Sequence, residues 1–318
     1  MEQKIAVYII NGSSLGGGEM DSILRASMHG GFVLPLQAIS VNVRKLCDRM
    51  CVQVLEAKDL FHDTHFKNVV IKSSGFFRDL TLSPMLLALA VHKRKLPDLE
   101  IGVHCDPLSS PISSTFKIRL ATFIYQIFGL IFASRVRFVS VRQLKTFSLL
   151  SKLKRHYVDP PCSMITKKYR GTVSVKSGEI ANSIAFIGRL SSSAILGDAK
   201  NSKFLPELSQ ALSAMNLTID IFGGGNQDSV MASLSKLDNV RLNGESLDVE
   251  GLLLRTSILV VPSNHEGYCL IAREASLLGS IVLVSPAVAP EIQALPNVVV
   301  VREMETTSWI QEIRKHLQ

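Results

Sequence analysis

Short apolar segments alternate with amphipathic ones along the first half of the chain. The segments that predict strands are residues 4–10, 52–55, 68–72, 98–106 and 136–140. Helices are expected over residues 83–94, 116–133 and 141–155. Buried strands that alternate with helices are typical of parallel sheets with helices on both faces. We therefore expect the first half to form one such sheet.

The same alternation restarts in the second half. Strands are expected within residues 183–190, 217–225, 239–244, 257–263, 279–285 and 297–301. Helices are expected over 202–215, 228–237 and 248–256, in the segment that carries Glu274, and over 306–317 with Thr306 or Thr307 as the N-cap. The pattern predicts an α/β fold of two doubly wound, Rossmann-like domains. Ligands of open parallel sheets bind at the carboxyl ends of the strands.

The predicted domain organisation follows from where the periodicity weakens. Residues 156–179 contain a Pro-Pro pair, glycines and charges but little regular spacing, which favours a linker. We assign residues 1–157 to an N-terminal domain, 158–181 to the linker, 182–305 to a C-terminal domain and 306–318 to a terminal helix. A length of 318 residues suits two domains.

Composition indicates a globular protein. Apolar residues make up 47% of the chain and the mean hydropathy is +0.25. The longest apolar run, 120–134, contains Gln126 and is shorter than the roughly 18 residues that span a bilayer. Residues 4–10 are too short for a signal peptide. The five cysteines include no CxxC pair, which favours reduced thiols in a cytosol, and the spacing of Cys47 and Cys51 would place them on one helix face.

Positive charge is concentrated in one segment. The net charge is +8, and residues 107–170 hold twelve Lys and Arg with Asp159 as their sole acid. One interpretation is an ordinary solvated basic face. The other is an anionic partner; signatures of nucleic-acid binding are missing, whereas basic residues that alternate with Phe, Leu and Ile suit an anionic membrane surface. We expect a peripheral protein on the cytoplasmic face of a membrane.

Two carboxylates flank the stretch Gly267–Arg273, just after a predicted buried strand. In a continuous helix the α-carbons of Glu266 and Glu274 would lie about 12 Å apart, beyond the roughly 5–9.5 Å of glycosidase carboxyl pairs. This spacing suits a long, hydroxyl-rich ligand. Gly267 would open the helix, whose first N–H groups could face an anion. The alternative is that Glu266 is a helix N-terminal charge and Glu274 faces solvent.

Cations near the next strand could bind a diphosphate. Arg189 follows a predicted strand, and Lys200 and Lys203 lie where the next helix begins. Arginine can bind phosphate oxygens with two hydrogen bonds, and lysine acts as a point charge. The alternative for each lysine is a surface helix charge. No Asp-x-Asp cluster follows a strand, so we predict no bound metal.

These segments resemble a known family. "FIGRL" with the following lysine, "IFGGG", "NVRLNG", "VVPSNHEGYCLIAREASLLGSIVLVS" and "PEI" occur in the same order as in the family-4 (group 1) glycosyltransferases of the GT-B fold. The resemblance is specific over about residues 180–295. In the first half, "GGGEM" is similar to the glycine loop that follows the family's first strand. The resemblance implies two domains that face each other across a cleft and a metal-independent sugar transfer with retention of configuration.

The resemblance also implies a role for each candidate residue. Arg189 and Lys200 would stabilise the departing diphosphate, with Lys200 preferred to Lys203 because "KNSKFL" is similar to the family's Lys-Gly-x-x-x-Leu, with Asn201 in place of glycine. Glu274 would bind ribose. Donor sugar and phosphate would contact Glu266 and the backbone of Gly267, Tyr268, Cys269 and Leu270. The diphosphate would also be approached by Gly16, Gly17 and Gly18. His104 and Asp106, at the end of a strand, would face the acceptor, although a structural histidine is an equal alternative.

The expected function is therefore transfer of a sugar from a UDP- or GDP-linked donor to a glycan, with a lipid-linked acceptor in cell-envelope polysaccharide synthesis (O-antigen, capsule or lipopolysaccharide). No cofactor is expected. Two alternatives remain. A catalytically silent GT-B module would act as a scaffold. A nucleotide-dependent dehydrogenase needs G-x-G-x-x-G after a strand, and neither "NGSSLGGGEMD" nor "IFGGGNQD" has that spacing.

Overall fold

The computed structural model describes residues 5–13, 16–62, 69–73, 98–109, 116–169, 183–190, 198–225 and 228–317. The helix expected over 83–94 lies outside the described residues, as do residues 170–181, the second half of the predicted linker. The chain divides into two compact units. The first consists of residues 1–106 and 119–163, and the second of 107–118 and 164–318.

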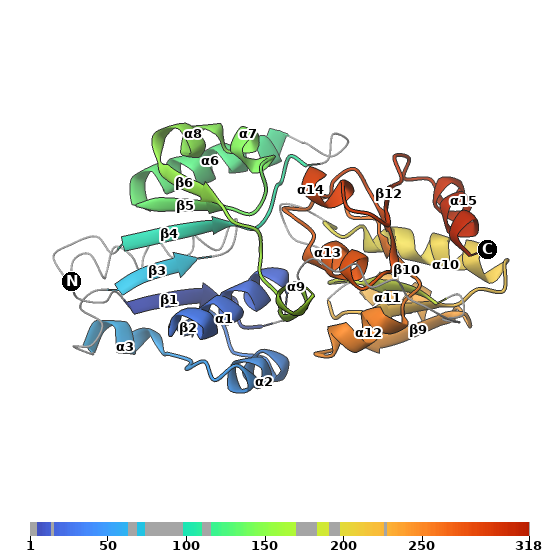
Figure 1. The fold of residues 1–318 in the computed structure, drawn as a ribbon, viewed down its shortest axis with the longest axis horizontal. Helices are drawn as coiled ribbons and strands as arrows, with labels where there is room; N and C mark the ends of the chain where they lie inside the picture. Colours follow the sequence, from blue (N-terminus) through green and yellow to red (C-terminus); the bar gives the residue numbers. More distant parts are fainter. Residues whose placement is uncertain are drawn as a thin grey trace. The chain divides into compact units, whose positions relative to one another are not determined.

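The first unit contains a parallel sheet of six strands (Figure 1). The strands are β1 (Ile5–Ile10), β2 (Phe32–Pro35), β3 (Val69–Ser73), β4 (Asp98–Val103), β5 (Arg135–Phe138) and β6 (Arg155–Val158). Their order is β2-β1-β3-β4-β5-β6, and every neighbouring pair is parallel. The order reverses at β1, because the chain adds β2 on one side and then β3 to β6 on the other.

Helices cover both faces of this sheet. They are α1 (Gly17–His29), α2 (Val41–Arg49), α3 (Ala57–His62), α6 (Phe116–Phe132, from residue 119 on), α7 (Gln143–Thr146) and α8 (Ser148–Leu153). Side chains of β1 alternate between two cores, as a strand requires. Val7 and Ile9 pack in the core that holds Tyr125 of α6, whereas Tyr8 and Ile10 pack in the core that holds Ile23 of α1.

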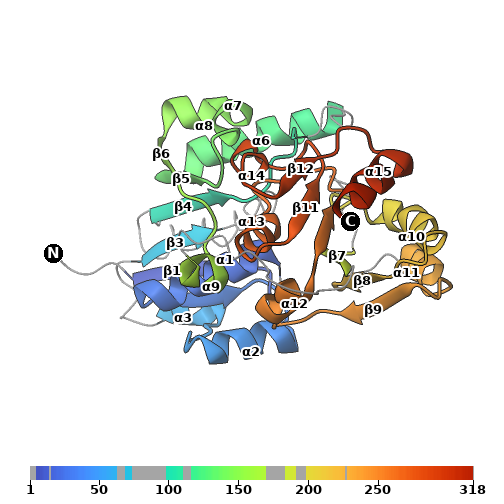
Figure 2. The ribbon, with the colours of Figure 1, turned by 45° about the vertical axis from the view of Figure 1, so that its right-hand side comes forward.

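The second unit contains another parallel sheet of six strands (Figure 2). The strands are β7 (Ile184–Ile187), β8 (Ile219–Phe222), β9 (Val240–Gly244), β10 (Ile258–Val261), β11 (Ile281–Val284) and β12 (Val298–Val300), in the order β12-β11-β10-β7-β8-β9. The helical segments are α9 (Met164–Lys168), a 3₁₀ turn (Ser202–Phe204), α10 (Leu205–Ser213), α11 (Asp228–Leu234), α12 (Val249–Arg255), α13 (Leu270–Leu277), α14 (Pro290–Gln293) and α15 (Thr306–His316). The predicted fold class of two parallel-sheet α/β domains is confirmed.

Several local predictions were wrong. The helix expected over 141–155 is two short helices followed by strand β6. Residues 52–55 contribute an isolated bridge between Val54 and Val33. The N-cap of α15 is Glu305, without a side-chain hydrogen bond, in place of Thr306 or Thr307. Strand β2 and helices α1, α2 and α3 were not predicted, and α9 lies inside the predicted linker.

The two closely spaced cysteines do not share a helix face. Helix α2 ends at Arg49, and Cys51 follows in the left-handed region with φ of 52°. Cys47 is buried and Cys51 is exposed. Within the described residues no helix combines the length and apolarity needed to cross a membrane.

Candidate functional site

The order of the second sheet reverses at β7, which lies between β8 and β10. Ile184 and Ala185 of β7 pair with Ile258 and Leu259 of β10. Ligands of open parallel sheets bind at the carboxyl ends of the strands beside such a reversal. Two loops leave the sheet there. Arg189 lies directly after β7, Lys200 lies before the 3₁₀ turn that precedes α10, and the loop after β10 carries Glu266.

Lys200 and Glu266 form an ion pair between these loops. The ammonium of Lys200 donates to Oε1 of Glu266, and the hydroxyl of Ser263 donates to the same oxygen at 3.0 Å. Burial disfavours the charged lysine, but the carboxylate of Glu266 outweighs it and raises the pKa of Lys200 above its ordinary value. Lys200 is therefore protonated at neutral pH.

Backbone hydrogen bonds align the two loops. The amides of Asn264 and His265 donate to the carbonyl of Ala199 at 2.9 and 3.1 Å. The side chain of Asn264 donates to the carbonyl of Asp198 at 3.0 Å. The carboxylate of Asp198 in turn accepts from the hydroxyl of Ser202 and the amide of Lys203. Lys200 is thus fixed opposite Glu266 by groups that surround both residues.

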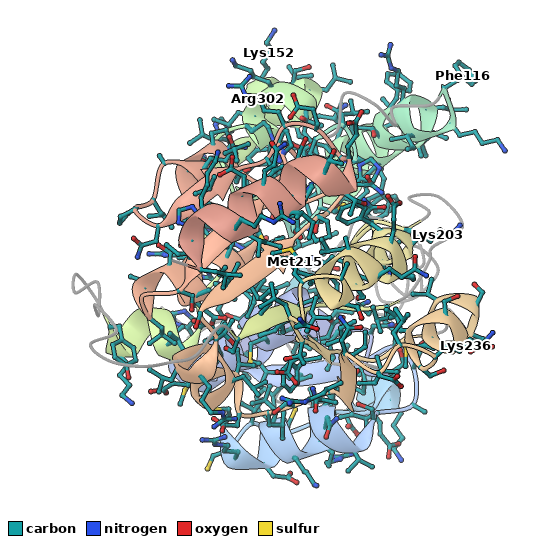
Figure 3. The ribbon with its side chains drawn as sticks, turned by 90° about the vertical axis from the view of Figure 1, so that its right-hand side faces the viewer. Phe116, Lys152, Lys203, Met215, Lys236 and Arg302 are labelled. Atoms are coloured by element: carbon teal, nitrogen blue, oxygen red, sulfur yellow. The ribbon has the colours of Figure 1, made fainter. Side chains whose placement is uncertain are left out.

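The structure separates the two candidate lysines. Lys203 is exposed, and Figure 3 shows it at the surface beside α10. Lys200, in contrast, forms the ion pair with Glu266. Asn201, between them, has φ of 54°, in the left-handed region that glycine adopts most readily and asparagine tolerates better than most residues. This conformation explains why the family's Lys-Gly pattern accommodates asparagine here.

A glycine turn fixes the loop of Arg189. The amides of Gly188 and Leu190 donate to the carbonyls of Phe222 and Gly224, both at 2.9 Å. A Cβ at Gly223 would lie 1.8 Å from the carbonyl oxygen of Gly188, and a Cβ at Gly225 would lie 1.7 Å from that of Leu190. Glycine is needed at both positions because the backbones approach so closely. Arg189 is half-buried at this turn.

The segment from Glu266 to Glu274 is not one helix. Residues 266–269 form a loop, and α13 begins at Leu270, so the prediction that Gly267 opens the helix was wrong. Cys269 is the N-cap, with φ of 77° and no side-chain cap. Glu274 lies inside α13 and is 7% exposed, which contradicts the alternative that it faces solvent.

The other donor-loop candidates are largely buried. Gly267, Tyr268 and Cys269 are buried and Leu270 is half-buried. The hydroxyl of Tyr268 accepts a hydrogen bond from Arg273 at 3.1 Å. Burial raises the pKa of the Cys269 thiol, with the Glu266 carboxylate adding to the effect, so this thiol is neutral near pH 7.

The three N-terminal glycines begin the first helix of the first unit. Gly16 is the N-cap of α1, and Gly17 and Gly18 are in its first turn. Gly17 is exposed, and a Cβ built on it would meet nothing within 4 Å. A role of these glycines in diphosphate binding stays a prediction.

His104 follows β4 and belongs to a buried charge cluster of the first unit. Nη2 of Arg137 lies 2.6 Å from Nε2 of His104 and 2.5 Å from Oδ2 of Asp21. Asp21, on α1, is fully buried and also pairs with Arg25 at 2.8 Å. The amide of Cys162 donates to the same carboxylate at 2.9 Å.

Burial and charge fix the protonation states in this cluster. Burial disfavours the charged forms of Asp21 and His104. For Asp21 the guanidinium of Arg137, helped by His104 and Arg25, outweighs burial and holds the pKa well below its usual range. For His104 burial dominates and lowers the pKa, against the opposing effect of Asp21. His104 is therefore neutral at pH 7.

Asp106 lies at the core of the same unit. Its side chain is fully buried, and its oxygens accept from Nε of Arg142 at 3.0 Å and from the hydroxyl of Thr146 at 3.1 Å. These contacts favour a structural role. Participation of His104 or Asp106 in chemistry stays a prediction.

Sequence reasoning missed four residues that support these sites: Asp198, Ser263, Asp21 and Arg137. Asp198 precedes a helix start by a few residues, which is a recognisable capping signal. Asp21 and Arg137 sit among apolar residues on a helix and on a strand, which is the pattern of a buried pair. Ser263 had no signal beyond its place after a strand. Among the described residues no three His, Cys, Asp or Glu side chains group as a metal site would require, and metal independence stays a prediction.

Comparisons with known proteins bear on the family and on the fold. Residues 181–318 match the family model "Glycosyl transferases group 1". Among solved structures, Anabaena Alr3699/HepE in complex with UDP and glucose is similar, at 14% identity and a TM-score of 0.74, over 98% of this chain and 89% of that one. A glycosyltransferase from Rickettsia africae is similar at 14% identity and a TM-score of 0.64, over 99% and 88% of the two chains.

No curated protein matches the sequence. The matched region begins just before β7 and contains Arg189, Lys200, Glu266 and Glu274. The structural likeness extends through both units. The chain therefore has the GT-B fold of these structures, and its residues 181–318 are similar to the group 1 glycosyltransferase family.

Proposed function

We propose that this protein is a glycosyltransferase that moves a sugar from a nucleotide sugar to a glycan acceptor. One observation carries the proposal: Lys200 and Glu266 meet where the order of the second sheet reverses, inside the segment that matches group 1 glycosyltransferases. A UDP-linked donor is the first choice because the similar HepE was solved with UDP and with UDP-glucose.

Each donor contact follows from the chemistry of the side chain. Arg189 and Lys200 bind the diphosphate and stabilise the charge that develops as the nucleoside diphosphate leaves. The positive end of the α13 helix dipole adds to this potential. Glu274 binds the ribose hydroxyls. Glu266 accepts hydrogen bonds from the donor sugar and releases Lys200 to the phosphate when the donor binds.

The reaction we propose proceeds with retention of configuration. The anomeric carbon–oxygen bond of the donor breaks, and the nucleoside diphosphate takes the bonding electrons. The acceptor hydroxyl attacks from the same face and loses its proton as the new glycosidic bond forms. No covalent sugar–enzyme intermediate is required.

We further propose a lipid-linked glycan as acceptor, in cell-envelope polysaccharide synthesis, with the protein held at the cytoplasmic face of a membrane. The excess of basic residues in 107–170 supports this proposal. The alternative, a catalytically silent scaffold, differs from a transferase in one measurable property. It would bind a nucleotide but would not turn over a nucleotide sugar.

Thermal stabilisation by nucleotides tests the donor site. A ligand at about 100 times its dissociation constant stabilises by about 2.7 kcal/mol. We expect UDP or GDP to do so for the wild type, and Arg189→Ala, Lys200→Ala and Glu274→Ala each to lower nucleotide affinity about tenfold or more. Lys203→Ala and the surface variant Lys236→Ala are matched controls that should bind as the wild type does.

Wild-type affinity in all three site variants would refute the site assignment. A large fall in melting temperature without nucleotide would instead give that residue a structural role. Release of nucleoside diphosphate with acceptor glycans, followed by NMR of the product anomer, then tests the transfer and its retention. Nucleotide binding with no turnover over a broad set of donors and acceptors would favour the scaffold.

A further inference from the structure

Helix α6 carries apolar side chains on a face that is exposed among the described residues. Large apolar residues of this helix are exposed by between 38% and 79%; they are Phe116, Leu120, Phe123, Ile124, Ile127 and Ile131. We call these six residues the α6 stripe. Phe116, the most exposed, lies at the outer end of the helix in Figure 3.

The α6 stripe is continuous. At 100° per residue, its six members fall within about 100° of one another around the helix, over a length of about 22 Å. The opposite face, with Thr122, Tyr125 and Phe128, is buried against the sheet. A helix that is apolar on all sides is normally buried, in a protein core or in lipid. A contiguous apolar surface of this kind marks an interaction site.

Positive charge borders the α6 stripe. Lys117 and Arg119 fall on its two edges by the same helical geometry, and both are exposed. The sequence of α6, FKIRLATFIYQIFGLIF, contains no acid. Helix α8, whose Leu149 amide donates to Gln126 of α6, adds the exposed Lys152 and Leu153. Figure 3 shows Lys152 pointing outward.

The charges decide between possible occupants. A second copy of the chain would bring the same cations against these cations, which is unfavourable. A nucleic acid would leave the apolar side chains in water. An anionic bilayer surface offers both partners, acyl chains for the α6 stripe and lipid phosphates for its edges. At about 25 Å, the helix is shorter than the roughly 30 Å hydrocarbon core, so it would lie in the plane of the interface.

We propose that α6 docks the protein on an anionic membrane, with the α6 stripe immersed below the phosphates and Lys117 and Arg119 bound to them. This inference names the element that would hold the protein at the membrane proposed above, and it does not depend on the transferase activity. A vesicle experiment and the nucleotide experiment can therefore fail separately.

Co-sedimentation with vesicles tests the docking. The wild type should bind vesicles of mixed phosphatidylcholine and phosphatidylglycerol and bind pure phosphatidylcholine far less. Phe123→Glu and Ile127→Glu should each lower the partition coefficient by more than about tenfold, because a charge replaces an immersed apolar side chain. Val41→Glu, at a residue of α2 that is 69% exposed, is the matched control and should bind as the wild type does.

A double variant tests the contribution of Lys117 and Arg119, the charged residues that border the α6 stripe. Lys117→Glu with Arg119→Glu should lower binding to anionic vesicles by about tenfold or more, and added salt should weaken the wild type. Far-UV circular dichroism of each variant checks the fold. The substituted side chains are exposed, so all should remain folded.

The fluorescence of a tryptophan placed in the α6 stripe measures directly whether the stripe enters the membrane. Trp309 is the sole tryptophan and is fully buried in the second unit, so Phe123→Trp adds one reporter to a constant background. Its emission should shift to shorter wavelength with anionic vesicles and be quenched by nitroxide-labelled lipid. An unchanged spectrum, equal binding to neutral vesicles, or no binding at low salt overturns the proposal. So does a dimeric wild type that Ile127→Glu converts to a monomer.

Discussion

Asn201 adopts a left-handed backbone conformation beside Lys200 and begins the turn that leads to α10. Residues with a Cβ lose roughly 1–2 kcal/mol in this conformation, asparagine less than most, and β-branched residues the most. The geometry of the lysine thus depends on a neighbour that does not itself need to contact any ligand.

We predict that Asn201→Val lowers the free energy of unfolding by about 1–3 kcal/mol, whereas Asn201→Gly changes it by less than about 1 kcal/mol. The reason is the positive φ, which glycine accepts without strain. Urea unfolding measures both. Equal costs for valine and glycine would show that the side chain of Asn201 matters, and its backbone angle does not.

Glu266 neutralises Lys200 in the unliganded protein, so a phosphate has to compete with a carboxylate for the ammonium group. Glu266→Gln removes this competition. We predict that free UDP or GDP then binds roughly three- to tenfold more tightly, the equivalent of about 0.7–1.4 kcal/mol, while sugar transfer slows. Titration calorimetry at low and high salt measures the affinity, and the gain should shrink with salt. Weaker nucleotide binding in this variant would contradict the competition.

At the scale of elements, the turn after β8 sets the position of the loop after β7. Gly223 and Gly225 leave space for the carbonyls of Gly188 and Leu190, and no side-chain contact could replace this approach. The glycines therefore position Arg189 although they lie more than thirty residues away in the sequence.

We predict that Gly225→Ala lowers nucleotide affinity about as much as Arg189→Ala, roughly tenfold or more, because its Cβ displaces the Leu190 backbone. Gly224→Ala is the control in the same turn, since its Cβ would lie 3.1 Å from the end of the flexible Glu245 side chain. Thermal shift with nucleotide compares them. Normal binding by Gly225→Ala would show that the loop of Arg189 adjusts freely.

The elements that sequence reasoning found are those with a buried, regular pattern. β10 and β11 are continuous apolar runs, and α6 keeps helical spacing over 17 residues. β6, with the sequence RHYV and three exposed residues, lies at a sheet edge and lacks that pattern. β2 is four residues long and ends in proline. The local pattern of apolar residues predicts these buried elements. The edge strands β2 and β6 depend on pairing with a strand that is distant in the sequence.

The same distinction applies to the candidate site. Arg189 and Glu266 became candidates because each follows a strand whose end is predictable, and Lys200 because it lies where the next predicted helix begins. The non-helical segment between Gly267 and Leu270 was not predicted. It depends on the left-handed φ of Cys269, which the spacing of residues does not reveal. The contacts of His104 and Asp106 required the positions of Arg137 and Arg142, which only the folded sheet brings close.

On the scale of the whole molecule, each unit has its own core, and the first is held together by the charge cluster around Asp21. This carboxylate joins α1 to β5, to the loop after β4 and to the segment after β6. Breaking a buried ion pair by removing one partner typically costs 3–5 kcal/mol, because the other charge stays buried without compensation.

We predict that Asp21→Asn lowers the stability of the first unit by about 3–5 kcal/mol at pH 7. Asp48→Asn, at an exposed position of α2, should change it by less than about 0.5 kcal/mol. Far-UV circular dichroism should register the loss. The unfolding transition of the second unit, followed by the fluorescence of Trp309, should be the same as in the wild type. A change of less than 1 kcal/mol, or an equal fall in both signals, would contradict this account of the cluster.

The pH dependence of this variant has a definite sign. The folded pKa of Asp21 is depressed, so its contribution is present above the unfolded value of about 3.9 and is lost as the pH falls toward the folded value. The difference between wild type and Asp21→Asn should therefore be largest near neutrality and shrink below about pH 4.

The second unit includes residues 107–118, which come from the middle of the chain. Ser109 of this segment accepts the backbone amide hydrogen of Glu266 through its hydroxyl oxygen at 3.1 Å. During synthesis at 5–20 residues per second, Ser109 leaves the ribosome roughly ten to thirty seconds before Glu266. The hydrogen bond between them can form only after β10 and the loop after it have been made. A fragment cut to begin at residue 164 would never receive this segment, and would expose the amide of Glu266 however well the rest of its sheet formed.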